Sequence, residues 1–435
     1  MTTPTRLERN LSRILDDLSA GPTPEYLDDL FVRTGRMRQR PAWTFPERWL
    51  PMTDITRPRV FAFAPPWRTI ALVLVVIALL AGAAFAYIGS QRRVPAPFGP
   101  ARNGLIPYVS GGDIYLGDPV TGKMHLLVGG PEDDAAPGFS PDGTRVAFIR
   151  SVPTGGSGPL PVDLYVVGAD GSDLRRITSA PIQDLVWADW MPDGRHLAVV
   201  HPVDIAKTGS PPSNQLELLD ATGQQPPILL AAAAGLDTMT FRPPEGREIL
   251  FRANIGGNYG LFRMNADGTN VQTLLEPNVS THFDQHLNVL KYSADGTRIF
   301  YQSYTQEPGG QAGCCQLWVM NADGTNPHRF VQDPATPGGW EGQPEVSPDG
   351  KWVAFNDGTP QVAVVRADGT GPLIKTGPSL KSVAHWGWSP DSTRILMMPD
   401  DGGNGSAYLL DPAGGPWTNV AWTSDIDMDW QRLAP

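Results

Sequence analysis

The stretch Phe139-Ser140-Pro141-Asp142-Gly143, followed directly by Thr-Arg-Val-Ala-Phe, decides the fold of most of this chain. Proline presets the backbone for a turn, aspartate bonds its own backbone, and glycine adopts a positive φ. An apolar strand ends before the turn and another begins after it. The spacing of the copies, roughly 40 to 55 residues, is typical of a four-stranded propeller blade. Related phrases begin at Trp190, Phe241, Tyr292, Val346 and Trp388.

A second phrase lies between these copies and places Asp-Gly, or a looser variant, between two apolar runs, which indicates a hairpin. Strong versions contain Asp170, Asp267, Asp323 and Asp368, and weaker ones contain Asp118, Asp220 and Asp411. The unit that begins at Gly104 lacks its own opening strand, and Ile426 to Arg432 is expected to supply it. We therefore predict an all-β propeller of seven four-stranded blades, closed by the C-terminal strand, with six blades as the alternative. Such closure removes exposed sheet edges.

The Ser-Pro-Asp-Gly turn and the Met-Asn-Ala-Asp-Gly-Thr-Asn hairpin resemble the WD-like repeats of TolB-type propellers. The resemblance covers about residues 102–433 and implies a fold more specifically than a function. Members of that group serve as periplasmic interaction modules, receptor ectodomains or gating domains of serine peptidases. The usual count in TolB itself is six blades, from which a count of seven departs.

Residues 70–88 carry no charge and are long enough, as a helix, to cross the hydrocarbon core of a membrane. Residues 1–68 have a net charge of +3, whereas the chain after Arg93 has a net charge of −16. The positive-inside rule then predicts a single-pass protein of the cell membrane, with a cytoplasmic N-terminus and an extracytoplasmic propeller. The acidic propeller argues against nucleic acid as a partner, because phosphate binding needs a basic face.

The N-terminal region predicts two short amphipathic helices, with an apolar stripe at Leu7, Leu11, Ile14 and Leu18. Helices this short bury no core of their own, so the stripes favour a cytoplasmic protein partner. The alternative is that this segment packs only on itself and on the bilayer. This layout resembles that of anti-sigma factors, although no cysteine precedes Cys314. The expected division is a cytoplasmic helical segment (1–40), a Pro/Trp-rich juxtamembrane linker (41–68), a transmembrane helix (69–89), a linker (90–101) and the propeller (102–433).

The aspartates of the repeated turns are expected to be structural, so residues that precede each innermost strand are better candidates for function. In a propeller such residues line the mouth of the central channel, where carboxylates bind a cation such as calcium or a basic peptide. A solvated acidic rim is the alternative. The candidates are Asp134, Asp184, Asp237, His286, Glu341, His385 and Asp425.

The two cysteines, Cys314 and Cys315, are adjacent and are expected in a long loop of the fifth blade. They are interpreted as a vicinal disulfide, a soft-metal ligand pair or two ordinary thiols. No further cysteine or histidine lies nearby at metal-ligand spacing.

No Gly-x-Ser-x-Gly, His-Glu-x-x-His or phosphate-loop motif occurs in the chain. The sequence therefore favours a binding protein for an extracytoplasmic peptide, protein or glycan, in the manner of an anti-sigma-like sensor. One alternative is an envelope hydrolase or lyase that uses His286, His385 or Asp237 at the channel mouth. The other is a passive envelope scaffold.

Overall fold

The structure is a computed structural model, and it describes residues 71–78, 80, 94–153, 160–202, 213–255, 258–275, 290–306, 312–331, 341–379, 383–399, 406–423 and 429–434. The chain divides into two compact units, residues 1–90 and residues 91–435. Each unit is described by itself below.

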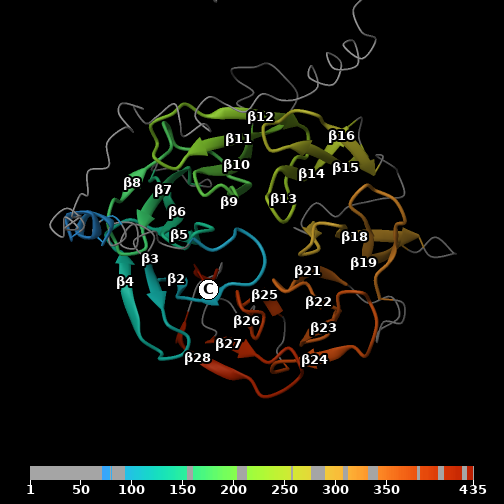
Figure 1. The fold of residues 1–435 in the computed structure, drawn as a ribbon. Helices are drawn as coiled ribbons and strands as arrows, with labels where there is room; N and C mark the ends of the chain where they lie inside the picture. The colour runs from blue at the N-terminus through green and yellow to red at the C-terminus, as the bar shows by residue number, and fades with distance from the viewer. Residues whose placement is uncertain are drawn as a thin grey trace, which may run out of the picture. The chain divides into compact units, whose positions relative to one another are not determined.

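Residues 91–435 form a ring of seven β-sheets, the blades, around a central axis (Figure 1). The count of seven blades is thus confirmed. Blade 1 contains β2 (Ile106–Ser110), β3 (Asp113–Gly117) and β4 (Met124–Val128). Blade 2 contains β5 (Asp134–Phe139), β6 (Arg145–Ser151), β7 (Val162–Gly168) and β8 (Arg175–Arg176). Blade 3 contains β9 (Trp187–Trp190), β10 (His196–Pro202), β11 (Asn214–Asp220) and β12 (Ile228–Ala233).

The other four blades repeat the same antiparallel order. Blade 4 contains β13 (Met239–Phe241), β14 (Glu248–Ile255), β15 (Asn258–Asn265) and β16 (Gln272–Leu275). Blade 5 contains β17 (Lys291–Tyr292), β18 (Arg298–Gln306), β19 (Ala312–Asn321) and β20 (His328–Arg329). Blade 6 contains β21 (Gly342–Val346), β22 (Trp352–Asn356), β23 (Val362–Arg366) and β24 (Ile374–Thr376). Blade 7 contains β25 (Val383–Trp388), β26 (Ile395–Pro399), β27 (Ser406–Leu410) and β28 (Thr418–Thr423).

The repeated Pro-Asp-Gly phrase forms the turn between the first and second strands of a blade, as predicted. In blade 2 the Ser140 N–H donates to the Arg145 carbonyl over 2.8 Å. Gly143 has a φ of 68°, which glycine adopts without steric cost. Asp142 Oδ1 accepts hydrogen bonds from the Ser140 hydroxyl and the Thr144 N–H. The turn therefore depends on residues within the repeated phrase itself, which is why it could be predicted from the sequence.

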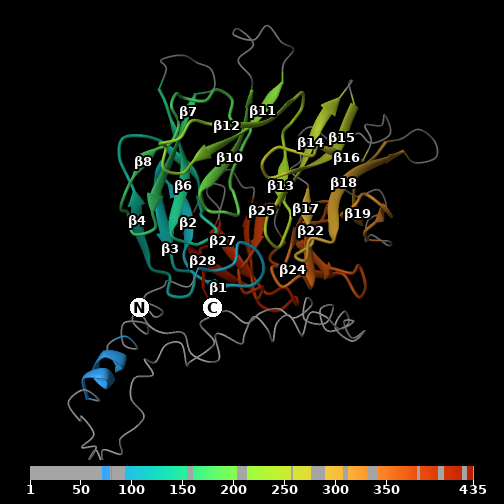
Figure 2. The ribbon, with the colours of Figure 1, turned by 45° about the horizontal axis from the view of Figure 1, so that its top comes forward.

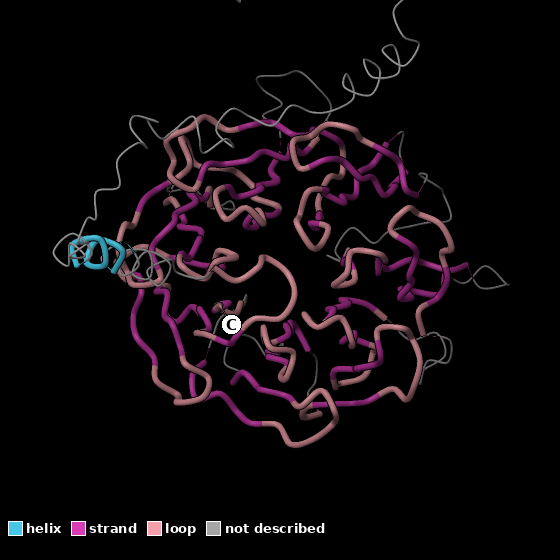
Figure 3. The backbone as a smooth tube through the Cα atoms, in the orientation of Figure 1, coloured by secondary structure: helices cyan, strands magenta, loops and turns pink. Residues whose placement is uncertain are grey.

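The two ends of the ring differ because each four-stranded blade is an antiparallel meander whose first strand lies nearest the axis (labelled in Figure 1 and seen in the same orientation in Figure 3). The turns between first and second strands, and between third and fourth strands, gather at one end, which we call the turn face. The other end, the connector face, carries the loops between second and third strands and the connections from blade to blade.

The hydrophobic core lies between neighbouring blades. One cluster joins blades 3 and 4 through Leu216, Ile249 and Phe262. Corresponding clusters occupy the other six interfaces among the described residues. Because the apolar residues of each sheet are buried against the next blade, the ring needs every blade to complete its core.

Blade 1 is a three-stranded sheet, in contrast to the predicted four strands, and the C-terminal residues lie where its first strand was expected. The Gln431 N–H donates to the Leu105 carbonyl over 2.8 Å, which matches the Ser140–Arg145 bond of blade 2. Trp430 is buried with Ile106 and Tyr108 of blade 1. Beyond it, β29 (Arg432–Leu433) pairs with β1 (Arg102–Asn103). In blade 1 the first and last residues of the propeller meet where the other blades have the turn between their first and second strands. Residues 426–428 of the predicted closing segment lie outside the described residues.

Residues 94–101, which we call the strap, lead into β1 and cross the turn face of the ring (Figures 1 and 2). Phe98 packs against the cluster between blades 3 and 4. The Ala101 N–H donates to the Pro390 carbonyl of blade 7 over 2.9 Å. Arg432 Nη2 donates to the carbonyls of Ala96 and Gly99. The strap therefore fastens the start of the propeller to its last residues.

In the N-terminal unit, residues 71–78 are helical. The large apolar side chains described there, from Leu72 to Ile77, are between 47% and 68% exposed. The described residues hold no helix with both the length and the apolar character of a membrane span. The remainder of the predicted span, and the whole predicted cytoplasmic head, lie outside the described residues.

The cysteine pair is placed differently from the expectation. Cys314 and Cys315 belong to β19, the third strand of blade 5, and lie beside a register shift against β18. The loop prediction was wrong because β19 already begins at Ala312 and pairs with β18 on both sides of the two cysteines. Their side chains lie outside the described ones, so the disulfide, metal and free-thiol interpretations all stay predictions.

Candidate functional sites in the central channel and on the turn face

Two of the predicted channel-mouth carboxylates are held inside their own blades by arginine. Arg150 Nε and Nη2 donate to the two oxygens of Asp134 over 2.6 and 2.8 Å. Asp237 forms the same forked pair with Arg252. Asp134 and Arg252 are both buried. Planar two-bond pairs of this kind fix geometry, so these carboxylates stabilise the blades and are not presented to a ligand.

A third predicted carboxylate, Glu341, joins blade 6 to blade 5. Its Oε1 accepts from Arg329 Nη2 over 3.0 Å, and its Oε2 accepts from the Leu317 N–H over 3.1 Å. The Glu341 carbonyl accepts from Gln302 Nε2 over 2.7 Å. With its side chain almost completely buried, Glu341 connects two blades.

The other predicted residues do not gather into one site. Asp184 is exposed with a φ of 49°, and His385 is exposed on β25. His286 and Asp425 lie outside the described residues. No cluster of three or more His, Cys, Asp or Glu side chains suited to a metal occurs in the described part of the chain. Calcium binding at the channel mouth stays a prediction.

A different set of residues shares one register position near the axis. Each precedes the apolar residue that ends a first strand. In six blades this residue pairs with the second residue of the apolar run in the second strand. These six residues are Gly138, Asp189, Thr240, Lys291, Glu345 and Gly387. Asp429, before Trp430, holds the same position in blade 1. We call these seven residues the channel ring: Asp429, Gly138, Asp189, Thr240, Lys291, Glu345 and Gly387.

One side of the channel ring is neutralised internally. Lys291 Nζ lies 2.8 Å from Glu345 Oε1. Burial alone would lower the pKa of Lys291, but the charge and hydrogen bond of Glu345 outweigh it and raise that pKa, with help from Asp189 and Asp429. Since Lys291 experiences the charges of both aspartates, the ring is one electrostatic unit.

The other side of the channel ring holds two carboxylates in unusual surroundings. Burial, and then the charge of Asp429, raises the pKa of Asp189 to about 6. Burial likewise raises the pKa of Asp429, against hydrogen bonds from Trp430 and Phe139. Both side chains are nevertheless open to solvent. A narrow central channel explains both observations, because it surrounds the two carboxylates with protein and still leaves them in contact with water.

Space remains around these carboxylates. A Cβ added at Gly138, between Asp429 and Asp189 in ring order, would meet no atom within 4 Å. The same holds at Gly387, on the other side of Asp429. Apart from Lys291 and Glu345, no ion pair forms within the channel ring in the described part of the chain. The arrangement can accept a cationic group.

The sequence also contains a signal for this ring. The channel-mouth prediction looked before each first strand, whereas the ring residues lie near its last position. Aligning the repeats on the apolar residue before the turn places Asp189, Lys291, Glu345 and Asp429 in one column. The recurrence of charged residues at this one aligned position, directly before a buried apolar residue, is the signal that identifies the ring.

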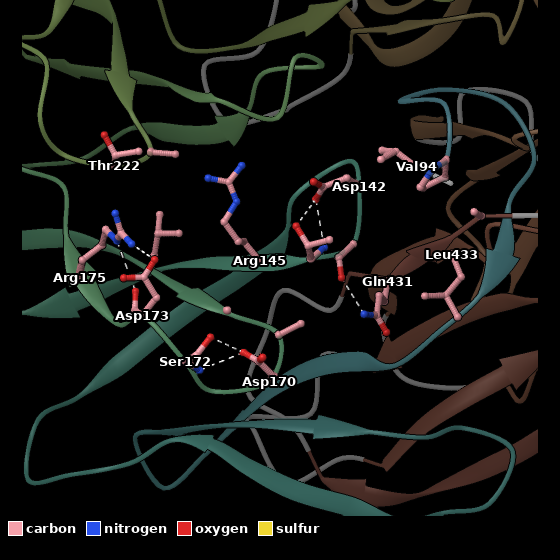
Figure 4. A pocket seen from close by; sticks show the side chains of 18 of the residues that line it. Val94, Asp142, Arg145, Asp170, Ser172, Asp173, Arg175, Thr222, Gln431 and Leu433 are labelled. Carbon is pink, nitrogen blue, oxygen red and sulfur yellow. Dashed lines mark hydrogen bonds and ion pairs between the residues drawn. The ribbon is translucent and has the colours of Figure 1, made fainter. Parts of the chain in front are cut away.

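A second candidate site is a cavity of about 860 Å³ on the turn face (Figure 4). Its walls come from the two turns of blade 2, Thr222 of blade 3, the strap residues Val94 and Pro95, and the C-terminal residues Gln431, Leu433 and Ala434. In Figure 4 the guanidinium of Arg145 extends between Asp142 and Thr222. The cavity therefore lies where the ring is closed.

Comparison with known proteins supports the fold and leaves the activity open. No family model matches the chain, and no curated protein matches it. Solved structures that resemble it include TolB from Acinetobacter baumannii, with 18% identity, a TM-score of 0.45, and coverage of 75% of this chain and 81% of that one.

Two other similar structures come from enzymes. The propeller domain of the Trilobed protease from Pyrococcus furiosus has 11% identity and a TM-score of 0.50, covering 75% of this chain and 97% of that one. Oligogalacturonate lyase from Vibrio parahaemolyticus has 14% identity and a TM-score of 0.50, covering 74% and 94%. At these identities the likeness shows the propeller fold alone.

Proposed function

We propose that this protein is a membrane-anchored binding protein whose extracytoplasmic propeller takes a cationic group of a peptide or protein into its central channel. The observation that carries the proposal is the pair Asp189 and Asp429, open to solvent beside the space at Gly138. Lys291 is already engaged by Glu345. The remaining charge of the channel ring is negative and favours a lysine or arginine side chain of the ligand.

The ligand enters from the connector face in this proposal. The ring residues lie near the ends of the first strands, close to the turn face, where the strap crosses. A slender extended side chain suits such a channel better than a bulky folded surface does. Glycan binding is an outcome of the test below.

Membrane anchoring is proposed from the apolar helix of residues 71–78, whose side chains are exposed all round. A helix that is apolar on every face suits a lipid environment. The charge asymmetry of the chain supports a cytoplasmic N-terminus. In this proposal residues 1–40 bind a cytoplasmic protein, in the manner of an anti-sigma-like sensor.

Binding is tested by calorimetry on the full-length protein in detergent, with amidated hexalysine and hexaglutamine peptides as probes. We expect hexalysine alone to bind, and Asp189→Asn to weaken it about tenfold. Binding should also weaken as the pH falls through about 6, because Asp189 then gains a proton. Asp267→Asn, at an exposed hairpin, makes the same charge change and should have no effect. Equal binding by both variants, or binding only of a neutral oligosaccharide, would contradict the proposal.

Anchoring is tested by fractionating cells that produce the full-length chain. The wild-type protein should remain with the membranes after a high-salt wash, and the double variant Leu74→Arg/Val76→Arg should move to the soluble fraction. Two charges in the middle of a span cost about 5 kcal/mol or more for insertion. A wild-type protein that is fully soluble would remove the anchor from the proposal. If a pull-down with the intact protein recovers no cytoplasmic protein that depends on residues 1–40, the proposed partner of this segment is removed and only the membrane anchor remains.

A further inference from the structure

We propose that the turn-face cavity is a second binding site, separate from the channel, and that the guanidinium of Arg145 binds a carboxylate of an acidic peptide there. The proposal does not depend on the function of the channel. It rests on how Arg145 is held, on what its charge faces, and on the residues that line the remaining walls.

Arg145 is held in one position by two contacts. Its Nη2 donates to the Gly194 carbonyl, and its guanidinium carbon lies 5.0 Å from the centre of the Trp190 ring. Trp190 is itself fixed, because it is buried and its Nε1 donates to the Gly138 carbonyl over 3.0 Å. Stacking on an aromatic face leaves the edge of a guanidinium free to donate. Arg145 is therefore oriented before any ligand arrives.

The acidic residues around the cavity are already engaged. Asp142 accepts from Ser140 and Thr144 within its turn, and Asp170 accepts twice from Ser172. Asp173 is paired with Arg175. Among the described residues, no carboxylate lies within ion-pair distance of Arg145, although its charge lowers the pKa of Asp142 from further away. The guanidinium has the Gly194 carbonyl as its hydrogen-bond acceptor. A carboxylate is the ligand that matches this geometry, through two parallel N–H···O bonds.

The remaining lining favours a peptide over a sugar acid. None of the residues that line the cavity is aromatic, so no ring is available for the apolar face of a sugar. The hydroxyls of Thr144, Ser172 and Thr222 each donate to an aspartate of their own turn. Their lone pairs remain to accept, and the N–H groups of a peptide backbone are suitable donors.

The test uses calorimetry on the full-length protein with three probes: hexaglutamate with both ends blocked, hexaglutamine with both ends blocked, and hexaglutamine with a free C-terminal carboxylate. We expect blocked hexaglutamate to bind and blocked hexaglutamine not to bind. Binding should weaken with salt. Binding of the free-ended hexaglutamine as well would support the same carboxylate chemistry and place its source at a chain end.

Arg145→Gln should weaken hexaglutamate binding about tenfold or more, as expected for loss of a charge-assisted pair. Arg298→Gln is the matched control, because Arg298 occupies the same turn position in blade 5 and also lies over an aromatic ring. Val94→Trp tests the cavity with Arg145 intact: Val94 is 62% exposed, and a larger side chain there should fill the space and weaken binding.

Three results would overturn the proposal. The first is equal hexaglutamate binding by the Arg145 and Arg298 variants together with no effect of Val94→Trp. The second is binding of blocked hexaglutamine as tight as that of hexaglutamate. The third is binding of an oligogalacturonate, measured as a fourth probe, when neither peptide with a carboxylate binds. Asp189→Asn should leave hexaglutamate binding unchanged, so failure of the channel proposal and failure of this one are distinguishable.

Discussion

Aspartates at the turns and aspartates in the channel of this propeller experience opposite surroundings. At the turns, hydrogen bonds from neighbouring residues hold the pKa of the carboxyl below its usual range, as for Asp118, Asp267 and Asp368. In the channel, burial raises the pKa of Asp189 to about 6. The same side chain therefore stabilises the fold at one place and is costly to ionise at the other.

The turn aspartates owe their low pKa to local donors. Asp267 accepts from the N–H and hydroxyl of Thr269, and Asp323 does the same with Thr325. Donors to the ionised form favour it. Since these donors lie two residues away, the arrangement forms whenever the turn forms, and the aspartate needs no ligand to be satisfied.

The channel aspartates owe their high pKa to long-range placement. Asp189 and Asp429 come from blades 3 and 1; burial raises the pKa of both, and the charge of Asp429 raises that of Asp189 further. A fold gains no stability from such a pair. Groups that cost stability at a solvent-accessible site are reasonable candidates for function, and this distinction separates the channel site from the many structural aspartates.

The larger expected effect is at the turns. Asp142→Ala removes the acceptor of hydrogen bonds from Ser140 and Thr144, and we expect a loss of about 2 kcal/mol in the free energy of unfolding at pH 7. Asp267→Ala, at a fully exposed hairpin, should cost less. Because the folded state lowers the pKa of Asp142, its contribution is present above the unfolded pKa and is lost as the pH falls through the folded pKa.

Urea unfolding of both variants at pH 7 and at pH 3 measures this difference. The gap between wild type and Asp142→Ala should narrow at the lower pH. An Asp142→Ala protein as stable as the wild type at pH 7 would show that the turn depends on its glycine and proline alone.

The smaller effect is in the channel and has the opposite sign. Asp189→Asn should raise the unfolding midpoint at pH 8, because the wild type must keep an enclosed carboxylate ionised there. The folded pKa of Asp189 is raised, so the native state binds more protons than the unfolded state between pH 4 and 6. The cost of the ionised carboxylate is therefore absent below the unfolded pKa and is complete once the pH has risen above about 6.

Thermal unfolding of Asp189→Asn and wild type at pH 8 and pH 4 provides the measurement. The advantage of the variant should shrink at pH 4. If Asp189→Asn were less stable than wild type by the same amount at both pH values, Asp189 would be a structural hydrogen-bond acceptor, and the contrast with the turns would be lost.

The sequence was sufficient for the blade count because turn chemistry is local: each Pro-Asp-Gly or Asp-Gly phrase carries its own donors and conformation. The channel mouth was predicted less well, since Asp134 and Asp237 find their arginines 16 and 15 residues away on the next strand. Such pairing depends on strand register. The channel ring was missed for the same reason, because which residue faces the axis becomes clear only when the first strands are aligned.

The seam between the first and last residues of the propeller also has a mechanical consequence. The strap, β1, Gln431 and β29 are joined by backbone bonds and by Arg432, all on the turn face. Tension applied through the N-terminal unit passes along the strap and into this short ladder. The seam, and none of the covalently continuous blades, is therefore the element at which a pull on the chain would begin to open the ring.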